Sequence, residues 1–128
     1  MFYRDTENIY RVSELDAFLW LVHGFGTRLS DIPARFGTRP QDVHAAIGPG
    51  IGKCCYEVGP EVAAQLGGQG RGHIDLADAN RRQLEESGVT PRRIYASNLC
   101  TMCRAEEFHS FRRDKEAAGR LHSFAGIR

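Results

Sequence analysis

The sequence predicts an α+β fold in which mixed β-sheets pack with helices, and three observations support this class. Short apolar segments typical of strands occur before residue 50 and again after residue 92. Between them lie two segments with helical start and stop residues. These strands and helices do not alternate regularly, as a parallel βαβ sheet would require. The 128 residues, 41% of them hydrophobic, suit one domain spanning residues 1–128.

The first predicted elements are two strands. Residues 8–12 alternate apolar and polar side chains, as a half-buried strand does. Residues 20–25 form a continuous apolar run that predicts a buried strand. Glycine and proline punctuate residues 26–42, which leaves room for one helical turn at 32–36. If the chain has a seam, we expect it in this weakly structured stretch.

A short buried strand is expected at residues 43–47, followed by a glycine-rich loop at 48–52 that no regular element could contain. Residues 59–66 predict a short helix, because Pro60 lies near its start and Gly67 directly after its end.

The clearest helix covers residues 76–87. Asp75 can cap its start, and Gly88 can adopt the left-handed conformation that ends it. Spacings of three and four place one set of side chains on a common face: Leu76, Ala79, Gln83 and Leu84.

Three strands are expected near the C-terminus. The first is residues 93–96. Residues 108–113 and 120–127 are interpreted as two strands joined by the polar turn 114–119.

Composition excludes several classes of protein. The 17 basic and 16 acidic side chains nearly cancel, so a basic nucleic-acid platform is not expected. The apolar run 18–22 is far shorter than the ~20 residues that cross a membrane. The first residues lack the pattern of a secretory signal, so four cysteines indicate free thiols in a reducing compartment, the cytoplasm.

The segment Gly48-Pro49-Gly50-Ile51-Gly52-Lys53 suggests phosphate binding by backbone amides. The nucleotide-binding P-loop needs Ser or Thr after its lysine, but Cys54 follows Lys53. The simpler interpretation, a tight turn where backbone segments pack closely, is favoured.

The cysteines form a C-x-x-C pair, Cys100 and Cys103, and an adjacent pair, Cys54 and Cys55. Together they could bind zinc through thiolates. Adjacent cysteines are awkward as tetrahedral ligands, and a redox C-x-x-C is expected beside a thioredoxin-like βαβ pattern, which is not found. Buried, reduced cysteines that act as small hydrophobic residues are therefore favoured.

Five histidines occur, but no two are three or four residues apart, so no helical metal pair is predicted. His109 and His122 could face each other across the predicted C-terminal hairpin. No metal-ligating residue is assigned.

Three arginines near that hairpin, Arg112, Arg113 and Arg120, could hold phosphate or carboxylate through their forked donors. The alternative is that they keep an exposed strand edge in water.

Several segments together resemble one family. Residues 40–52, Cys54-Cys55-Tyr56-Glu57-Val58-Gly59, Cys100-Thr101, Phe108-x-Ser110-Phe111-Arg112-Arg113 and Gly119-Arg120 occur in the order seen in the C-terminal half of laccase-domain proteins. This family is also called the multicopper polyphenol oxidase or YfiH-like family, and its members are described as purine nucleoside phosphorylases. Residues 20–28 resemble the family's N-terminal "HGF-x-T-R" segment.

The resemblance implies an α+β fold and phosphorolysis of adenosine, inosine and methylthioadenosine, with adenosine deamination. It also implies one zinc or copper ion bound by two histidines and a cysteine in "Q-x-H", "A-D-C-x-P" and "H-A-G-W-R-G" segments. None of these segments is in this sequence, so no metal or catalytic residue can be assigned by resemblance, and no retained metal is expected. The middle of the family domain looks deleted, with the join between residues 30 and 39.

We therefore expect a shortened, purine nucleoside phosphorylase-like protein, and the sequence leaves open whether it is an active enzyme. Its expected ligands are a purine nucleoside and phosphate. The candidate binding residues are Arg28, Gly50, Arg112, Arg113 and Arg120. The missing core strands would leave apolar surface exposed, so the chain must form a homo-oligomer, rearrange or be marginally stable. The alternatives are a non-catalytic fold remnant or interaction module, and a small thiol-based zinc or redox protein.

Overall fold

The structure is a computed structural model that describes residues 1–19 and 37–125. The chain divides into two compact units, Met1–Asp42 and Val43–Arg128. The strand expected at 20–25 and the helical turn expected at 32–36 lie outside the described residues. The join expected between residues 30 and 39 lies mostly outside them, so the single shortened domain stays a prediction.

The first unit contains a small antiparallel hairpin. Strand β1 (Phe2–Arg4) pairs with β2 (Tyr10–Val12), and the 3₁₀ turn Ser13–Leu15 follows. The carboxylate of Asp5 accepts hydrogen bonds from the backbone N–H groups of Glu7 and Ile9, which closes the connecting loop. The strand predicted at residues 8–12 is confirmed from Tyr10 onward. A second 3₁₀ turn, Pro40–Asp42, ends the unit.

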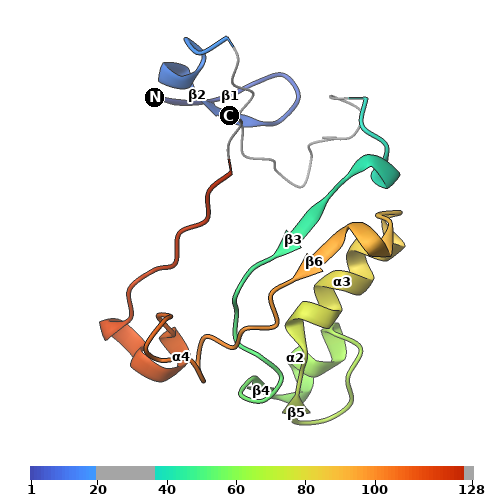
Figure 1. Ribbon diagram of the computed structural model, residues 1–128, viewed down its shortest axis with the longest axis vertical. Coiled ribbons are helices and arrows are strands. Elements are labelled where there is room, and N and C mark those ends of the chain that lie inside the picture. The colour runs from blue at the N-terminus through green and yellow to red at the C-terminus, as the bar shows by residue number, and fades with distance from the viewer. Residues whose placement is uncertain (20–36, 126–128) are drawn as a thin grey trace. The chain divides into compact units, whose positions relative to one another are not determined.

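The second unit is built on two parallel strands, β3 (Ala45–Ile47) and β6 (Ile94–Ala96), which lie side by side in Figure 1. A parallel pair needs a long crossover, and the segment between the strands supplies it. Beyond the strands the two segments stay paired, because an isolated parallel bridge joins Gly50 to Cys100. The loop after β3 therefore lies beside the segment after β6.

The crossover begins with a helix inside a two-stranded hairpin. Strand β4 (Glu57–Val58) pairs antiparallel with β5 (Gly72–His73), and α2 (Pro60–Gln65) lies between them in sequence. Pro60 occupies the first turn of α2, as predicted, because its missing N–H would have no intrahelical partner there.

Helix α3 (Leu76–Glu86) completes the crossover, and both of its predicted ends are confirmed. The Asp75 side chain accepts a hydrogen bond from the Asp78 N–H at 2.9 Å. At the other end Gly88 has φ +94°, and the N–H groups of Gly88 and Val89 donate to Glu85 O and Leu84 O. These two bonds form a Schellman motif. The 3₁₀ turn Pro91–Arg93 then leads into β6, which confirms the strand predicted at 93–96.

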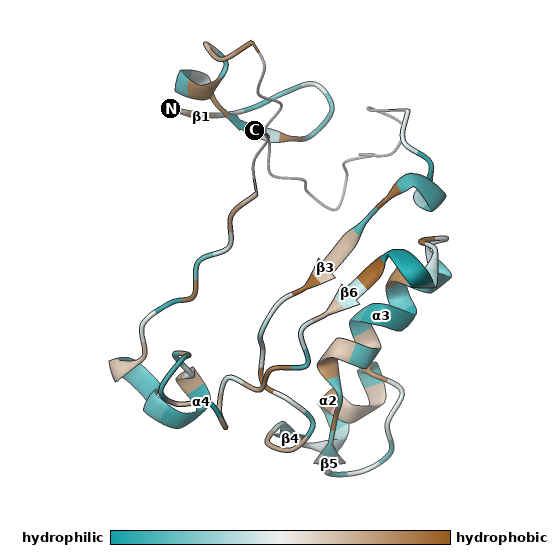
Figure 2. Cartoon of the chain, in the orientation of Figure 1, coloured by the Kyte–Doolittle hydropathy of each residue, from teal (hydrophilic) through white to brown (hydrophobic). Residues whose placement is uncertain are grey.

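The core of the second unit is small. Its buried apolar side chains are Val58, Ala63, Ala79, Val89 and Ile94. Figure 2 shows hydrophilic residues along much of α3, and the strands β3 and β6 mainly in hydrophobic colours. The strand predicted at 43–47 was expected to be buried, but β3 is only half-buried, since β6 is its single partner among the described strands.

The predicted C-terminal hairpin is wrong. Residues 111–114 form the short helix α4 (Phe111–Asp114), the 3₁₀ turn Lys115–Ala117 follows, and residues 118–125 contain no strand. Ser110 explains the difference, because its buried side chain caps the helix by accepting the Arg113 N–H. Across the two described stretches, no helix has both the length and the apolar character needed to span a membrane.

Candidate functional site

A cavity of about 410 Å³ lies where the glycine-rich loop, the start of α3 and the segment after β6 meet. Its walls are residues 47–54, 75–77, 80 and 97–100. All of them belong to the second unit. This volume is in the range of small-molecule sites, roughly 300–1,000 Å³.

Backbone pairing holds the glycine-rich loop in place. The Gly50 N–H donates to Leu99 O at 3.3 Å, and the Thr101 N–H donates to Gly50 O at 3.0 Å. Gly52 lies so close to the opposite segment that an added Cβ would be 3.1 Å from the Cβ of Cys100. The expected tight turn with close backbone packing is therefore confirmed.

Polar groups of opposite character line the cavity. Lys53 brings a cation, whereas Asp75 brings a carboxylate. Asn80 and Asn98 add amide groups that can both donate and accept hydrogen bonds. The first N–H groups of α3 have no intrahelical partner and favour negative charge. The lining of the cavity thus offers both donors and acceptors to a small polar ligand.

Arg113 is engaged within the protein. Its guanidinium donates to the backbone oxygens of Thr101, Met102 and Phe108 at 2.9–3.0 Å. It also forms a two-bond pair with the Asp114 carboxylate, with both distances 2.8 Å. Arg113 therefore fastens α4 to the turn that contains Cys100 and Cys103, and its predicted role in anion binding stays a prediction.

The other predicted binding residues are dispersed. Arg112 donates to Glu57 O at 3.1 Å, and its guanidinium lies 5.3 Å from the centre of the Tyr56 ring. Arg120 donates only weakly, to Ala118 O and Gly119 O beside it in sequence. Arg28 lies outside the described residues. Of the five candidates, the cavity wall includes only Gly50 among those described.

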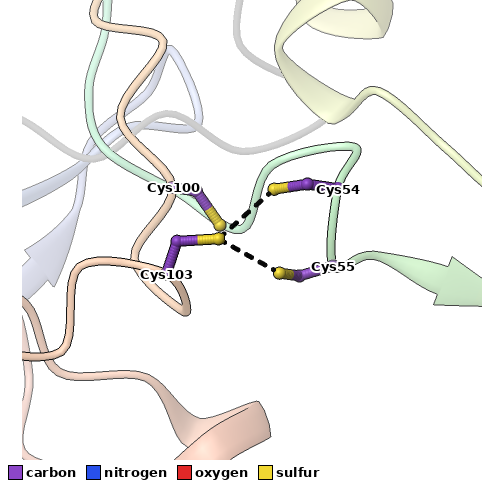
Figure 3. A group of neighbouring side chains, drawn as sticks. All are labelled: Cys54, Cys55, Cys100 and Cys103. Atoms are coloured by element: carbon purple, nitrogen blue, oxygen red, sulfur yellow. Dashed lines mark hydrogen bonds between the residues drawn. The ribbon is translucent and has the colours of Figure 1, made fainter.

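The structure brings all four cysteines together. Figure 3 shows Cys54 and Cys55, from the loop before β4, facing Cys100 and Cys103, from the segment after β6. All four sulfur atoms lie within 4.8 Å of one another. The Sγ of Cys103 is 3.5 Å from that of Cys54 and 3.4 Å from that of Cys55. The interpretation as buried hydrophobic residues is wrong for Cys54 and Cys103, which are exposed.

The four thiols differ in acidity. Burial raises the pKa of the Cys100 thiol. Hydrogen bonds from the N–H groups of Gly52, Cys103 and Met102 lower this pKa by a larger amount, so it falls to about 6. The Gly52 N–H donates to the Cys100 sulfur at 3.2 Å. Hydrogen bonding to Cys103 raises the pKa of Cys54, and hydrogen bonding to Cys55 raises that of Cys103. Neighbouring thiols and burial also raise the pKa of Cys55, against an opposing hydrogen bond to Cys103. The Cys100 thiol is thus the most acidic of the four.

Sequence reasoning considered a joint zinc site of both cysteine pairs but favoured buried, separate thiols. The pairs are more than 40 residues apart, and only the Gly50–Cys100 bridge of the parallel segments brings them together. The parallel pairing of residues 45–47 with 94–96 would have been the useful indication, but nothing in the composition of either strand specifies its partner.

The histidines within the described stretches do not supply the two-histidine, one-cysteine ligand set that the resemblance implies. Within residues 1–19 and 37–125, the cysteine cluster is the one group of potential metal ligands, and it contains no histidine. His44 instead stacks on Tyr95, and His109 lies against Gly119. The described residues therefore do not fit that metal group, and no chemical step is derived through it.

Comparison with known proteins gives consistent results. A purine nucleoside phosphorylase from Deinococcus radiodurans is 39% identical over 116 residues, covering 83% of this chain and 44% of that protein. The purine nucleoside phosphorylase YlmD of Geobacillus stearothermophilus is 39% identical over 103 residues, covering 70% and 38%. The chain thus spans about two fifths of the length of these relatives.

Solved structures agree. The crystal structure of YlmD from Geobacillus stearothermophilus matches with a TM-score of 0.64 at 37% identity, covering 68% of this chain and 37% of that one. The Bacillus licheniformis hypothetical protein YfiH matches with a TM-score of 0.59 at 34% identity, covering 63% and 36%. These likenesses and the observed mixture of strands and helices establish the α+β class. Residues 25–128 match the family model described as multi-copper polyphenol oxidoreductase laccase, and the chain belongs to this family.

Proposed function

We propose that this protein is purine nucleoside phosphorylase-like and binds a purine nucleoside and phosphate in the cavity beside the glycine-rich loop. The observation that carries this proposal is the cavity itself, whose size and mixed polar lining suit such ligands. The names of relatives that are 39% identical add support. In phosphorolysis a phosphate oxygen bonds to the ribose C1′ while the bond from C1′ to the purine nitrogen breaks. The products are ribose 1-phosphate and the free base.

The lining residues of the cavity offer suitable groups to both ligands. Lys53 and the backbone N–H groups of the glycine-rich loop are suited to phosphate, since both offer donors to an anion. Asn80 and Asn98 can bond the edge of a purine, and the Asp75 carboxylate can accept from a ribose hydroxyl group. Gly50 also lines the cavity.

The arginines extend the proposal beyond the cavity. Arg28, Arg112, Arg113 and Arg120 remain candidates for phosphate binding. Of these, Arg112 and Arg120 have exposed guanidiniums with few internal bonds. Turnover would also need the groups that hold the family's metal, which the described residues do not provide. We therefore propose ligand binding as the retained function, at work in a reducing compartment that keeps all four cysteines free.

Isothermal titration of the purified chain with inosine, adenosine and inorganic phosphate tests this proposal. We expect saturable binding of a nucleoside that weakens at least tenfold in Asn80→Ala, and phosphate binding that weakens similarly in Lys53→Ala. Arg112→Ala and Arg120→Ala test the sequence-based candidates. Hypoxanthine or inosine formation, followed by chromatography, would reveal phosphorolysis or deamination.

Arg92→Ala is the matched control, because it removes an exposed cation that does not line the cavity. It should bind both ligands as the unmodified chain does. Binding that is absent in the unmodified chain, or that survives both cavity substitutions, would contradict the proposal.

A second candidate, a protein-interaction module, is favoured by the thin core. Large apolar side chains of the second unit are exposed, among them Tyr95 at 53% and Phe111 at 58%. No large side chain among the described residues is fully buried. Light scattering coupled to gel filtration tests this function, which predicts an oligomer rather than a monomer.

A further inference from the structure

The cysteine cluster combines two pairs of thiols from two separate segments. Cys54 and Cys55 follow the glycine-rich loop, and Cys100 and Cys103 lie in the turn after β6. These are all the cysteines of the chain, since the sequence contains four. Their sulfur atoms point toward one another in Figure 3. Four unconnected thiols rarely gather by chance on a chain that carries no other cysteine.

The spacing of the sulfur atoms matches that of a zinc tetrahedron. A Zn–S bond of about 2.3 Å places tetrahedral sulfur ligands about 3.8 Å apart. Cys103 is 3.4 Å from Cys55 and 3.5 Å from Cys54, measured between sulfur atoms, and no pair exceeds 4.8 Å. Changes of at most about 1 Å in the sulfur–sulfur distances would thus suffice to reach the spacing of a zinc tetrahedron.

The surroundings of the sulfurs also suit bound thiolates. The Gly52 N–H donates to the Cys100 sulfur, and such donors stabilise negative charge on a ligating atom. Arg113 bonds the backbone oxygens of Thr101 and Met102, inside the turn between the second pair of ligands. This turn is therefore held from outside by α4, independently of any ion.

We propose that Cys54, Cys55, Cys100 and Cys103 bind one zinc ion as a closed, structural site that fastens the glycine-rich loop to the turn after β6. Four protein ligands leave no open position, which is typical of structural rather than catalytic zinc. Zinc replaces the protons of the thiols, these protons pass to solvent, and no electrons move. The zinc proposal does not depend on the nucleoside proposal, although Cys54 and Cys100 also line the cavity.

Two other states of the chain, a disulfide and a metal ion bound elsewhere, can be distinguished from the proposed zinc site. A disulfide between Cys103 and either Cys54 or Cys55 would form by loss of two hydrogens to an oxidant, and it would lower the mass of the chain accordingly. A metal bound elsewhere, through histidine or carboxylate, would lack sulfur ligands. Both outcomes contradict the proposal.

The test uses the full chain, purified under reducing conditions without a chelator. We expect about one zinc per chain by elemental analysis, retained through gel filtration. Replacement by cobalt should give the near-ultraviolet thiolate-to-cobalt absorption and the intense visible bands of tetrahedral coordination. Cys54→Ser and Cys103→Ser should each lower the affinity for zinc at least a hundredfold, measured against a competing chelator.

Arg104→Ser is the matched control, since it places a serine directly beside Cys103, at an exposed position, and removes no thiol. It should keep the zinc content and the cobalt spectrum. Circular dichroism of each variant shows whether it folds, and reloading the reduced, zinc-free unmodified chain provides a measurement that needs no variant. Failure of that chain to take up zinc, a cobalt spectrum without the thiolate band, or zinc retained after both cysteine substitutions would overturn the proposal.

Discussion

At the scale of single residues, Gly52 determines how closely the two cysteine-bearing segments approach. An added Cβ would lie 3.1 Å from the Cys100 Cβ and 3.3 Å from the Cys54 sulfur. Both distances are tighter than ordinary contacts, and overpacking of this kind typically costs about 1–3 kcal/mol. We therefore expect Gly52→Ala to weaken zinc binding about fivefold or more.

Gly48→Ala provides the comparison for Gly52→Ala, because a Cβ at Gly48 meets no atom within 4 Å. Competition with a chromophoric chelator measures the zinc affinity of both variants. Equal zinc affinities in the two variants would show that an added Cβ at Gly52 does not disturb the cysteine cluster.

The pair of Arg113 and Asp114 gives the second residue-scale prediction, which concerns pH. The hydrogen bond from Arg113 lowers the pKa of the Asp114 carboxyl below its usual value. A lowered pKa in the folded state means that the pair stabilises the fold above the unfolded pKa of about 4. The contribution is lost as the pH falls through the lowered folded value.

We therefore expect Asp114→Asn to be less stable than the unmodified chain at pH 7, with the difference shrinking toward pH 2. Urea unfolding followed by circular dichroism at several pH values measures this difference. Glu116→Gln, an exposed carboxylate of the next turn, is the control and should change little. A difference that stays constant with pH would exclude the charged pair as its cause.

At the scale of elements, helix α3 depends on its capped start. Asp75 accepts the Asp78 N–H, and replacement of such a cap by alanine typically costs about 0.5–2 kcal/mol. We expect Asp75→Ala to lower the free energy of unfolding by about 1 kcal/mol in urea titrations. Asp78→Ala removes only an exposed ion pair with Arg82 and should cost less. Equal losses would contradict a capping role.

Elements were predictable where local chemistry decides them. The sequence around α3 contains a cap, a glycine that accepts φ +94° and a face of spaced apolar residues, and the predicted span of 76–87 differs from the observed one by a single residue. Leu76, Ala79 and Leu84 lie on the half-buried or buried side as expected, whereas Gln83 is exposed.

The prediction of a C-terminal hairpin was wrong for two reasons, one in the local sequence and one in the tertiary contacts. Residues 108–113 were interpreted as a strand, but Ser110 starts a helix and Arg113 bonds three backbone oxygens outside that helix. Those bonds reach residues 101, 102 and 108, and no periodicity in the sequence reports them. The suggestion that His109 and His122 face each other depended on this hairpin, which the described residues do not form.

At the scale of the whole molecule, the sequence identified the residues of the site but not how the fold brings them together. The glycine-rich loop was recognised by itself, and a joint zinc site of the two cysteine pairs was considered but not favoured. Their meeting follows from the parallel pairing of β3 with β6, whose register continues to the Gly50–Cys100 bridge. Such long-range pairing depends on packing of the intervening crossover, which one sequence does not specify. The arginines were predicted to form one anion site, yet the described ones are bonded at separate places.

This assembly also links the two proposed ligands. Cys54 and Cys100 belong both to the cysteine cluster and to the wall of the 410 Å³ cavity. Zinc that fixes these residues would order the cavity wall before the nucleoside binds. The entropy cost of that ordering would then no longer reduce the affinity for the nucleoside. We therefore expect inosine to bind the zinc-loaded chain at least fivefold more tightly than the reduced, zinc-free chain.

Thermodynamic reciprocity makes this coupling testable from both sides, because inosine must then raise the affinity for zinc by the same factor. Calorimetric titration of inosine with and without zinc measures one side, and chelator competition with and without inosine measures the other. Cys103→Ser, whose residue lies in the cluster but not in the cavity wall, should bind inosine as weakly as the zinc-free chain does, whether or not zinc is added. Inosine affinity that is independent of zinc would show that the cavity is already ordered by the backbone bonds of Gly50 alone.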